Sequence, residues 1–189
     1  NAMLRIVADL GQVVQAESGV LQARPSPFEM GLAVREACRG EEWSLPRGIR
    51  FELRAPTAPV PLSADRGLVD QVLRILLRKA VSHAAEDSAV VLSWSSEPAD
   101  SELPERVLVT IARRGAQRTP NELSRMFSLF AAPAPARAEA TREHLAMMTC
   151  RVMVELHAGR IWAANVADGF EVRLWLPRTS DSESMRAGS

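Results

Sequence analysis

The sequence has few cysteines and histidines, and each shortage excludes a class of protein. Cys38 and Cys150 have no partner at CxxC spacing, and the three histidines form no metal-binding pattern. We therefore expect a reduced, cytoplasmic domain with no disulfide and no metal site. No apolar run approaches the roughly 18 residues that a membrane span requires. Basic and acidic residues balance at 23 each, which argues against nucleic-acid and membrane-surface binding.

What the sequence does contain is enough apolar material for one sizeable core. The chain has 189 residues, of which 47% are hydrophobic. Lys79 is the only lysine, and it lies in the segment 65–84, around which we expect the fold to be organised. Apolar residues at helical spacing predict a buried stripe on this helix: Val69, Val72, Leu73, Leu76 and Ala80. A second face carries residues four apart: Gln71, Ile75, Lys79 and His83.

The remaining pattern predicts an α/β two-layer sandwich (α+β). Runs rich in valine, leucine and isoleucine predict strands at Ala89–Ser95 and Arg106–Ala112. Further strands are expected at Ile49–Arg54, Ala58–Leu62, Arg160–Val166 and Phe170–Leu176. We expect a mixed, mostly antiparallel sheet covered by helices on one face and preceded by a protruding N-terminal helix over Met3–Leu21. The stretch Ala131–Ala140 predicts a mobile loop, and Thr179–Ser189 a disordered tail or linker.

Capping patterns predict where the other helices begin and end. Ser26–Glu29 and Thr119–Glu122 both read as capping boxes with proline at the first helical position. The first helix should bury Met30, Ala33, Val34, Ala37 and Cys38. A further helix over Thr141–His157 should bury Leu145, Met148, Val152 and Leu156 and end at a left-handed Gly159.

Three separated motifs resemble one family. The central helix is similar to the DxxRLxQVLxNLLxNAxxF helix of the histidine-kinase-type ATPase (Bergerat/GHKL) catalytic domain of two-component sensor kinases. Arg125–Phe130 (RMFSLF) and Val154–Trp162 (VELHAGRIW) are close to that family's RIFxxF and VELHGGxIW. The resemblance implies three regions: residues 1–22 as the truncated end of a dimerisation-hairpin helix, residues 23–178 as the ATPase-like domain, and residues 179–189 as the tail or linker.

The same resemblance implies a degenerate nucleotide site. Ile75 and Lys79 stand where the family has two asparagines, the first of which binds Mg²⁺. Arg113 replaces the aspartate that accepts a hydrogen bond from the adenine amino group, and a guanidinium has donors only. Gly115 keeps the first glycine of the same DxGxGI loop, whereas Gln117 replaces the second.

The phosphate-binding turn differs as well. His144 and Ala146 replace the two glycines of the family's GLGL turn, which adds Cβ atoms where backbone should meet phosphate. We therefore expect neither bound ATP nor Mg²⁺, no metal ligand and no catalytic residue. If the family fold holds, four basic residues converge on one cleft as contacts for an anion or an acidic partner: Lys79, Arg113, Arg114 and Arg118. The alternative is that the arginines form an ordinary solvated loop.

These features favour a pseudokinase or regulatory docking module of a two-component histidine kinase. The expected partners are a response regulator or a partner kinase, with a second copy of the chain bound through Met3–Leu21. One alternative is an active histidine kinase with an unorthodox ATP site that uses Lys79 and the arginines. The other is a histidine phosphotransferase whose ATPase-like domain is nonfunctional, which requires a phosphoacceptor histidine before Met3.

Overall fold

The computed structural model describes residues 22–39, 45, 48–128 and 138–178. A five-stranded sheet has the order β2-β4-β5-β7-β6, and β1 pairs with β3 in a separate two-stranded sheet. Strand β2 runs parallel to β4, and the other neighbours in the large sheet are antiparallel. The strands are β1 (Ser26–Glu29), β2 (Arg50–Arg54), β3 (Pro61–Ala64), β4 (Ala89–Glu97), β5 (Arg106–Arg114), β6 (Arg160–Val166) and β7 (Gly169–Pro177). The mixed, mostly antiparallel sheet is confirmed.

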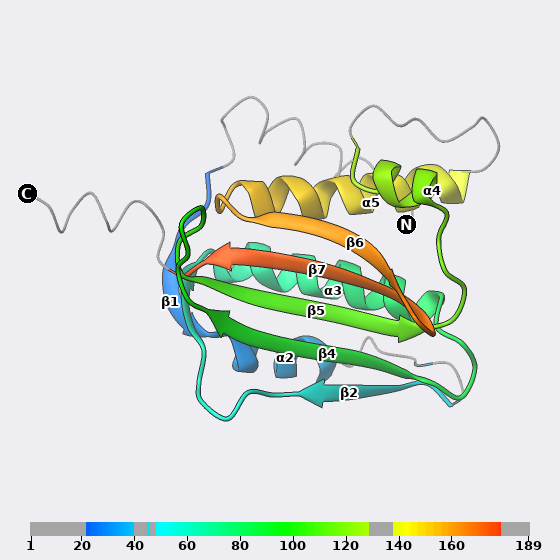
Figure 1. The fold of residues 1–189 in the computed structure, drawn as a ribbon, viewed down its shortest axis with the longest axis horizontal. Coiled ribbons are helices and arrows are strands. Elements are labelled where there is room, and N and C mark those ends of the chain that lie inside the picture. Colours follow the sequence, from blue (N-terminus) through cyan, green and yellow to red (C-terminus); the bar gives the residue numbers. More distant parts are fainter. Residues whose placement is uncertain (1–21, 40–44, 46–47, 129–137, 179–189) are drawn as a thin grey trace, which may run out of the picture.

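The helices form a second layer on one face of this sheet (Figure 1). They are α2 (Met30–Arg39), α3 (Arg66–Ser82), α4 (Pro120–Arg125) and α5 (Ala138–Glu155). Helix α3 lies between α2 and α5 and packs on β4 and β5, whereas α5 packs on β6 and β7. The predicted two-layer sandwich is therefore confirmed. No helix among the described residues has the length and apolar character to cross a membrane.

Helix α3 has the predicted amphipathic build. The Asp65 carboxylate caps it by accepting a hydrogen bond from the backbone N–H of Leu68 at 3.1 Å. The apolar stripe is buried: Val69, Val72, Leu73, Leu76 and Ala80. On the second face Ile75 is half-buried and packs against the core. Burial of this stripe between sheet and helices fixes which side of α3 points towards α5.

Alternation along β5 decides which of its side chains meet the helices. Val107, Val109 and Ile111 are buried, and the residues between them are half-exposed. Because successive side chains of a strand point to opposite faces, Arg113 lies on the helix-covered face and Arg114 on the open one. Arg113 is accordingly buried, and Arg114 is exposed. A guanidinium thus enters the layer between sheet and helices.

The segment Ser26–Glu29 is strand β1 and not a capping box, so that prediction is wrong. It pairs with β3, with Ser26 opposite Ala64. Helix α2 begins at Met30 because the Glu29 carboxylate accepts hydrogen bonds from the N–H groups of Gly31 (2.8 Å) and Leu32 (2.7 Å). Of the predicted core residues, Cys38 is only half-buried, and the others are buried: Met30, Ala33, Val34 and Ala37.

Helix α5 begins earlier than predicted, since Ala138–Ala140 belong to it and not to a loop. Its buried face is also wider than predicted. Only Met148 of the expected residues is buried, and the rest are half-buried: Leu145, Val152 and Leu156. The core is completed by Met147, Cys150, Met153 and Val154. The helix touches both α3 and β6, so its contact surface is broader than one sheet-facing stripe.

The end of α5 differs from the prediction as well. Ala158, not Gly159, adopts the left-handed conformation, with φ of 54°. The N–H of Gly159 donates to the carbonyl of Val154, and that of Ala158 donates to Glu155, which is the Schellman pattern. Gly159 is needed for another reason: a Cβ there would lie 2.4 Å from the carbonyl oxygen of Trp175.

Other predictions are confirmed or lie outside the described residues. The capping box at Thr119–Glu122 is present and begins α4. The β6–β7 hairpin forms as expected. The N-terminal helix over Met3–Leu21, the loop residues 131–137 and the tail at 179–189 lie outside the described residues, so the division into regions stays a prediction.

Candidate functional site

A cavity of about 330 Å³ lies between α3, α4, α5 and the ends of β5 and β7. Its apolar wall comes from both layers of the fold: Leu76, Ile111, Met126, Met147, Phe170 and Val172. Polar side chains line the remainder, and they come mainly from α3, α4 and the start of α5. The cavity therefore combines an apolar inner wall with a charged rim.

Arg113 is the most deeply placed charge of this cavity. Its side chain is on the buried face of β5, and the residue is 6% exposed. The guanidinium carbon lies 5.3 Å from the centre of the Phe170 ring, and Phe170 is its neighbour across β5 and β7. Its Nη1 has no hydrogen-bond partner among the described residues. Burial, helped by the charge of Arg118, lowers the pKa of Arg113.

Space for this guanidinium depends on Gly115. Gly115 has φ of 135°, and a Cβ there would approach Arg113 Nη1 to 2.9 Å and the carbonyl oxygen of His83 to 3.2 Å. A glycine tolerates this backbone conformation at little cost. Gly115 thus leaves room for the Arg113 guanidinium.

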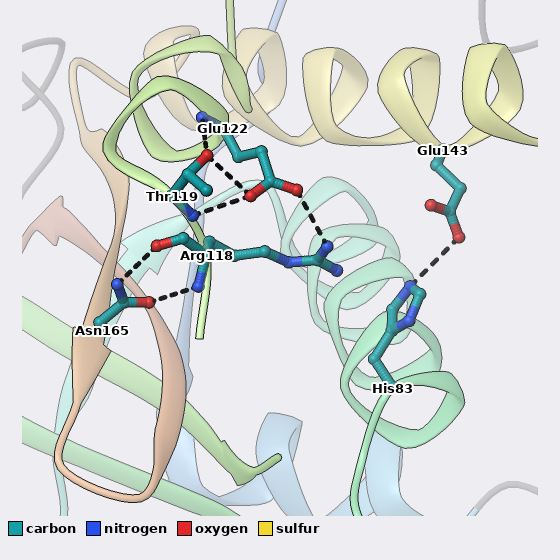
Figure 2. A network of polar contacts seen from close by, with 6 residues as sticks. All are labelled: His83, Arg118, Thr119, Glu122, Glu143 and Asn165. Carbon is teal, nitrogen blue, oxygen red and sulfur yellow. Dashed lines mark hydrogen bonds and ion pairs between the residues drawn. The ribbon is translucent and has the colours of Figure 1, made fainter. Parts of the chain in front are cut away.

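Lys79 is paired with a carboxylate across the cavity. Its Nζ donates to Glu143 Oε1 at 2.6 Å, and His83 Nε2 lies 3.3 Å from the same oxygen (Figure 2 shows His83 and Glu143). Burial by itself would raise the pKa of Glu143, but the hydrogen bonds and charges of Lys79 and His83 outweigh it. The pKa of Glu143 is therefore lowered, and the carboxylate is committed to α3.

Arg118 is held by a polar network on the opposite side (Figure 2). The Asn165 side chain accepts from the Arg118 N–H at 2.8 Å and donates to its carbonyl at 2.7 Å. Glu122 accepts from the N–H and hydroxyl of Thr119, both at 2.8 Å, and the backbone bond is the main reason that its pKa is lowered. Arg118 Nη1 lies 3.5 Å from Glu122, and its buried Nε has no described partner.

The structure brings together only part of the predicted site. Lys79, Arg113, Arg118 and His144 line the cavity, and His144 Nε2 has no described hydrogen-bond partner. Other predicted residues lie elsewhere. Arg114, Gly115 and Gln117 line a second hollow, and Ile75 and Ala146 are half-buried outside the described cavity lining. Three of the four basic residues thus converge as expected, and Arg114 does not.

Several residues in or beside the cavity are not predicted by the sequence. Glu143 directly precedes the His144 position, yet only its contact with the single lysine identifies it. Arg125 and Asn121 line the rim, and the RMFSLF motif that contains Arg125 does not indicate this position. Asn165 on β6 was missed because its partner is 47 residues away in the sequence. The usable signal was the Thr119–Glu122 capping box, which fixes where α4 begins.

The chemical character of the cavity is that of a donor-rich, positively charged site. Four cations line it, Lys79, Arg113, Arg118 and Arg125, against two carboxylates, Glu122 and Glu143. Two positive charges are therefore in excess when the histidines are neutral. Such an excess beside apolar walls favours an anion.

Comparisons with known proteins place the chain. ThkA, a histidine kinase, has a catalytic domain solved in a nucleotide-free form that matches with a TM-score of 0.68 and 22% identity, over 84% of this chain and 98% of that one. The histidine kinase AdeS of Acinetobacter baumannii matches with a TM-score of 0.68 and 18% identity, over 92% of this chain and 77% of that one. The structure of ThkA in complex with the response regulator TrrA matches with a TM-score of 0.68 and 20% identity, over 96% of this chain and 51% of that one.

The similarity to these solved structures shows the fold of the chain. Its family is shown by a match to a family model. No curated protein sequence gave a match. The model described as histidine kinase-, DNA gyrase B-, and HSP90-like ATPase matches residues 64–180, which is more than half of the chain. The chain, with its two-layer fold and the cavity between α3, α5 and the sheet, therefore belongs to the family of histidine kinase-, DNA gyrase B- and HSP90-like ATPases.

Proposed function

We propose that this chain is a regulatory, non-nucleotide-binding ATPase-like domain of a two-component signalling protein. The observation that carries the proposal is the buried guanidinium of Arg113. In the family resemblance an acceptor for the adenine amino group belongs at this position, and Arg113 offers only donors. An adenine there would face its amino group against Arg113 Nη1, donor against donor.

Ile75 and the paired side chains of the cavity also fit Mg²⁺–ATP poorly. Ile75, which lies outside the cavity lining but takes the position of the Mg²⁺ ligand in the family resemblance, has no oxygen for a hard cation. Lys79 is already bound to Glu143 at 2.6 Å, so a phosphate would have to displace that carboxylate. Glu122, the other carboxylate of the cavity, accepts hydrogen bonds from Thr119. These contacts support a domain that acts through protein contacts and not through phosphoryl transfer.

Calorimetry of the domain with Mg²⁺–ATP tests this proposal. We expect no measurable binding up to millimolar nucleotide. Arg113→Asp restores the acceptor and is expected to gain weak affinity, whereas Arg114→Asp is the matched control, because its side chain lies on the other face of β5. A micromolar dissociation constant for the unchanged domain would refute the proposal and favour the active-kinase alternative.

The partner we propose is a response regulator or a partner kinase. ThkA, which shares the fold, has been solved in complex with the response regulator TrrA, and this supports the choice. Assembly as a homodimer through Met3–Leu21 is part of the same proposal. Light scattering on the full chain and on a version that starts at Gln22 tests it, since only the longer chain should be dimeric.

The phosphotransferase alternative makes a separate demand. It needs a phosphoacceptor histidine on a helix that precedes Met3. Incubating the natural full-length protein with a phosphorylated response regulator separates the two ideas. Transfer of the phosphoryl group to a histidine of the protein would favour the phosphotransferase, and no transfer would favour the regulatory domain.

A further inference from the structure

We propose that the cavity beside Arg113 binds a small organic carboxylate with an apolar body. This rests on the proposed function, because the ligand takes the space that a nucleotide would otherwise need. It also gives the site a function of its own. Where the family resemblance implies a hydrogen-bond acceptor for adenine, this chain has hydrogen-bond donors, and donors recognise an anion.

The first support is the unpaired buried charge. Arg113 is 94% buried, as its 6% exposure shows, yet its Nη1 meets no hydrogen-bond acceptor among the described residues. Leaving a buried donor of a charged group unpaired is costly. The face of Phe170 at 5.3 Å offsets part of that cost but accepts no N–H···O bond. Arg113 also lines the cavity, so a carboxylate bound there would lie beside this guanidinium and offset its charge.

The second support is that the two carboxylates lining the cavity are bound to other groups. Glu143 accepts from Lys79 at 2.6 Å and contacts His83. Glu122 accepts from Thr119 and reaches only the Nη1 of Arg118, at 3.5 Å. In the described part of the chain neither carboxylate forms an ion pair with Arg113. The anion that Arg113 lacks must therefore come from outside the described structure.

Arg118 supplies a second donor to the same space. Its Nε is buried and has no described partner, and its charge is close enough to lower the pKa of Arg113. Asn165 fixes the Arg118 backbone with two short hydrogen bonds, so the side chain has a defined starting point. Two neighbouring guanidiniums that line one cavity suit a carboxylate, whose two oxygens both accept hydrogen bonds.

Size and lining decide what carries the carboxylate. A cavity of about 330 Å³ is at the small end of the usual range for ligand pockets. Its inner wall, which includes Phe170, Ile111 and Met147, favours an apolar body. Because Arg113 is 6% exposed, the flat surface of a protein partner does not reach it. An apolar wall also penalises a dianionic phosphate more than a monoanion.

Methionine methyl NMR with 3-phenylpropionate as the probe tests the proposal. Met126 and Met147 line the cavity, whereas Met30 and Met153 line a different, apolar hollow and serve as internal references. We expect 3-phenylpropionate to shift the Met126 and Met147 resonances and to leave the references in place. The neutral analogue 3-phenylpropionamide should bind at least tenfold more weakly. Equal binding of acid and amide would overturn the proposal, and so would equal shifts by inorganic phosphate.

Three variants identify the recognising group. Arg113→Leu should weaken 3-phenylpropionate binding by about thirtyfold or more, the low end of what losing one partner of a buried charge pair costs. Arg118→Gln keeps Arg113 and should weaken binding less. Arg114→Leu, the exposed neighbour, should bind as the unchanged protein does. Unchanged affinity in both Arg113→Leu and Arg118→Gln would overturn the proposal.

The two proposals fail in different ways. Micromolar Mg²⁺–ATP binding together with Arg113-dependent binding of 3-phenylpropionate would refute the proposed function and leave the carboxylate site standing. Absence of both ATP binding and 3-phenylpropionate binding would refute the carboxylate site and leave the proposed function standing.

Discussion

Lys79, the only lysine of the chain, donates a hydrogen bond to Glu143 at 2.6 Å and so joins α3 to α5. The Lys79 side chain is 26% exposed and that of Glu143 35% exposed. His83, one turn further along α3, contacts the same carboxylate oxygen. One carboxylate therefore links the two helices that form one side of the cavity.

The first prediction concerns this ion pair. Glu143→Gln should lower the free energy of unfolding by about 1 kcal/mol at pH 7, a value kept small because water screens a pair that is one-third exposed. Glu155→Gln is the control, since Glu155 pairs with Arg151 at 2.7 Å on the outside of the same helix. That variant should cost about 0.3–0.5 kcal/mol. Urea unfolding measures both, and equal losses would contradict a special role for Glu143.

The second prediction is the pH dependence of the same contribution. The folded-state pKa of Glu143 is lowered, so its stabilisation is full above the unfolded value of about 4.3 and is lost as the pH falls through the folded value. The stability difference between the unchanged protein and Glu143→Gln should therefore shrink below about pH 4.3. Urea midpoints at pH 7, 5, 4 and 3 measure it. A difference that stays constant over this range would contradict the assignment.

The sequence predicts helix α3 and the face that carries Lys79, but it does not predict the ion pair with Glu143. Helical periodicity places Lys79 on a face with Ile75 and His83, and the structure keeps that face towards α5. Glu143 is 64 residues away, and no local spacing links the two. The burial of Arg113, the first of the two arginines after Ala112, could have been predicted from the strand pattern. Strand alternation continues for one more step, so Arg113 is buried although a short charge run usually is solvated.

The third prediction follows from the buried charge. Arg113→Leu should raise the free energy of unfolding by about 1–2 kcal/mol, because it removes an unpaired buried charge and adds apolar contact in its place. Arg114→Leu should change stability by less than about 0.5 kcal/mol, since that side chain is exposed. Urea unfolding with an unchanged m-value is the measurement. A clear loss of stability in Arg113→Leu would mean that the guanidinium has a partner outside the described residues.

Tertiary pairing overrode two local signals in the fold. Ser26–Glu29 satisfies the capping-box pattern, but its backbone pairs with β3, and the cap is moved three residues to Glu29. Glycine after a helix usually marks the left-handed position, but here Ala158 takes it. Gly159 is retained because the carbonyl of Trp175 leaves no room for a side chain. Neither contact is visible in the spacing of neighbouring residues.

The fourth prediction tests the Glu29 cap. Glu29→Ala should lower the free energy of unfolding by about 1–2 kcal/mol, because the N–H groups of Gly31 and Leu32 lose their acceptor. Glu52→Ala is the control, since the only ion pair of Glu52 among the described residues is with the exposed Arg54 side chain. Thermal unfolding by circular dichroism measures both. A loss no larger than that of the control would show that the strand pairing alone sets the start of α2.

The fifth prediction makes the same exchange, in opposite directions, at adjacent positions. Ala158→Gly should stabilise the domain by about 0.5–1 kcal/mol, because alanine is strained at φ of 54° and glycine is not. Gly159→Ala should destabilise it by about 1–3 kcal/mol, since the added Cβ meets the backbone oxygen of Trp175 at 2.4 Å. Thermal unfolding of both variants gives the two signs. Changes of the same sign would contradict the Schellman geometry, because only that arrangement strains one position and crowds the next.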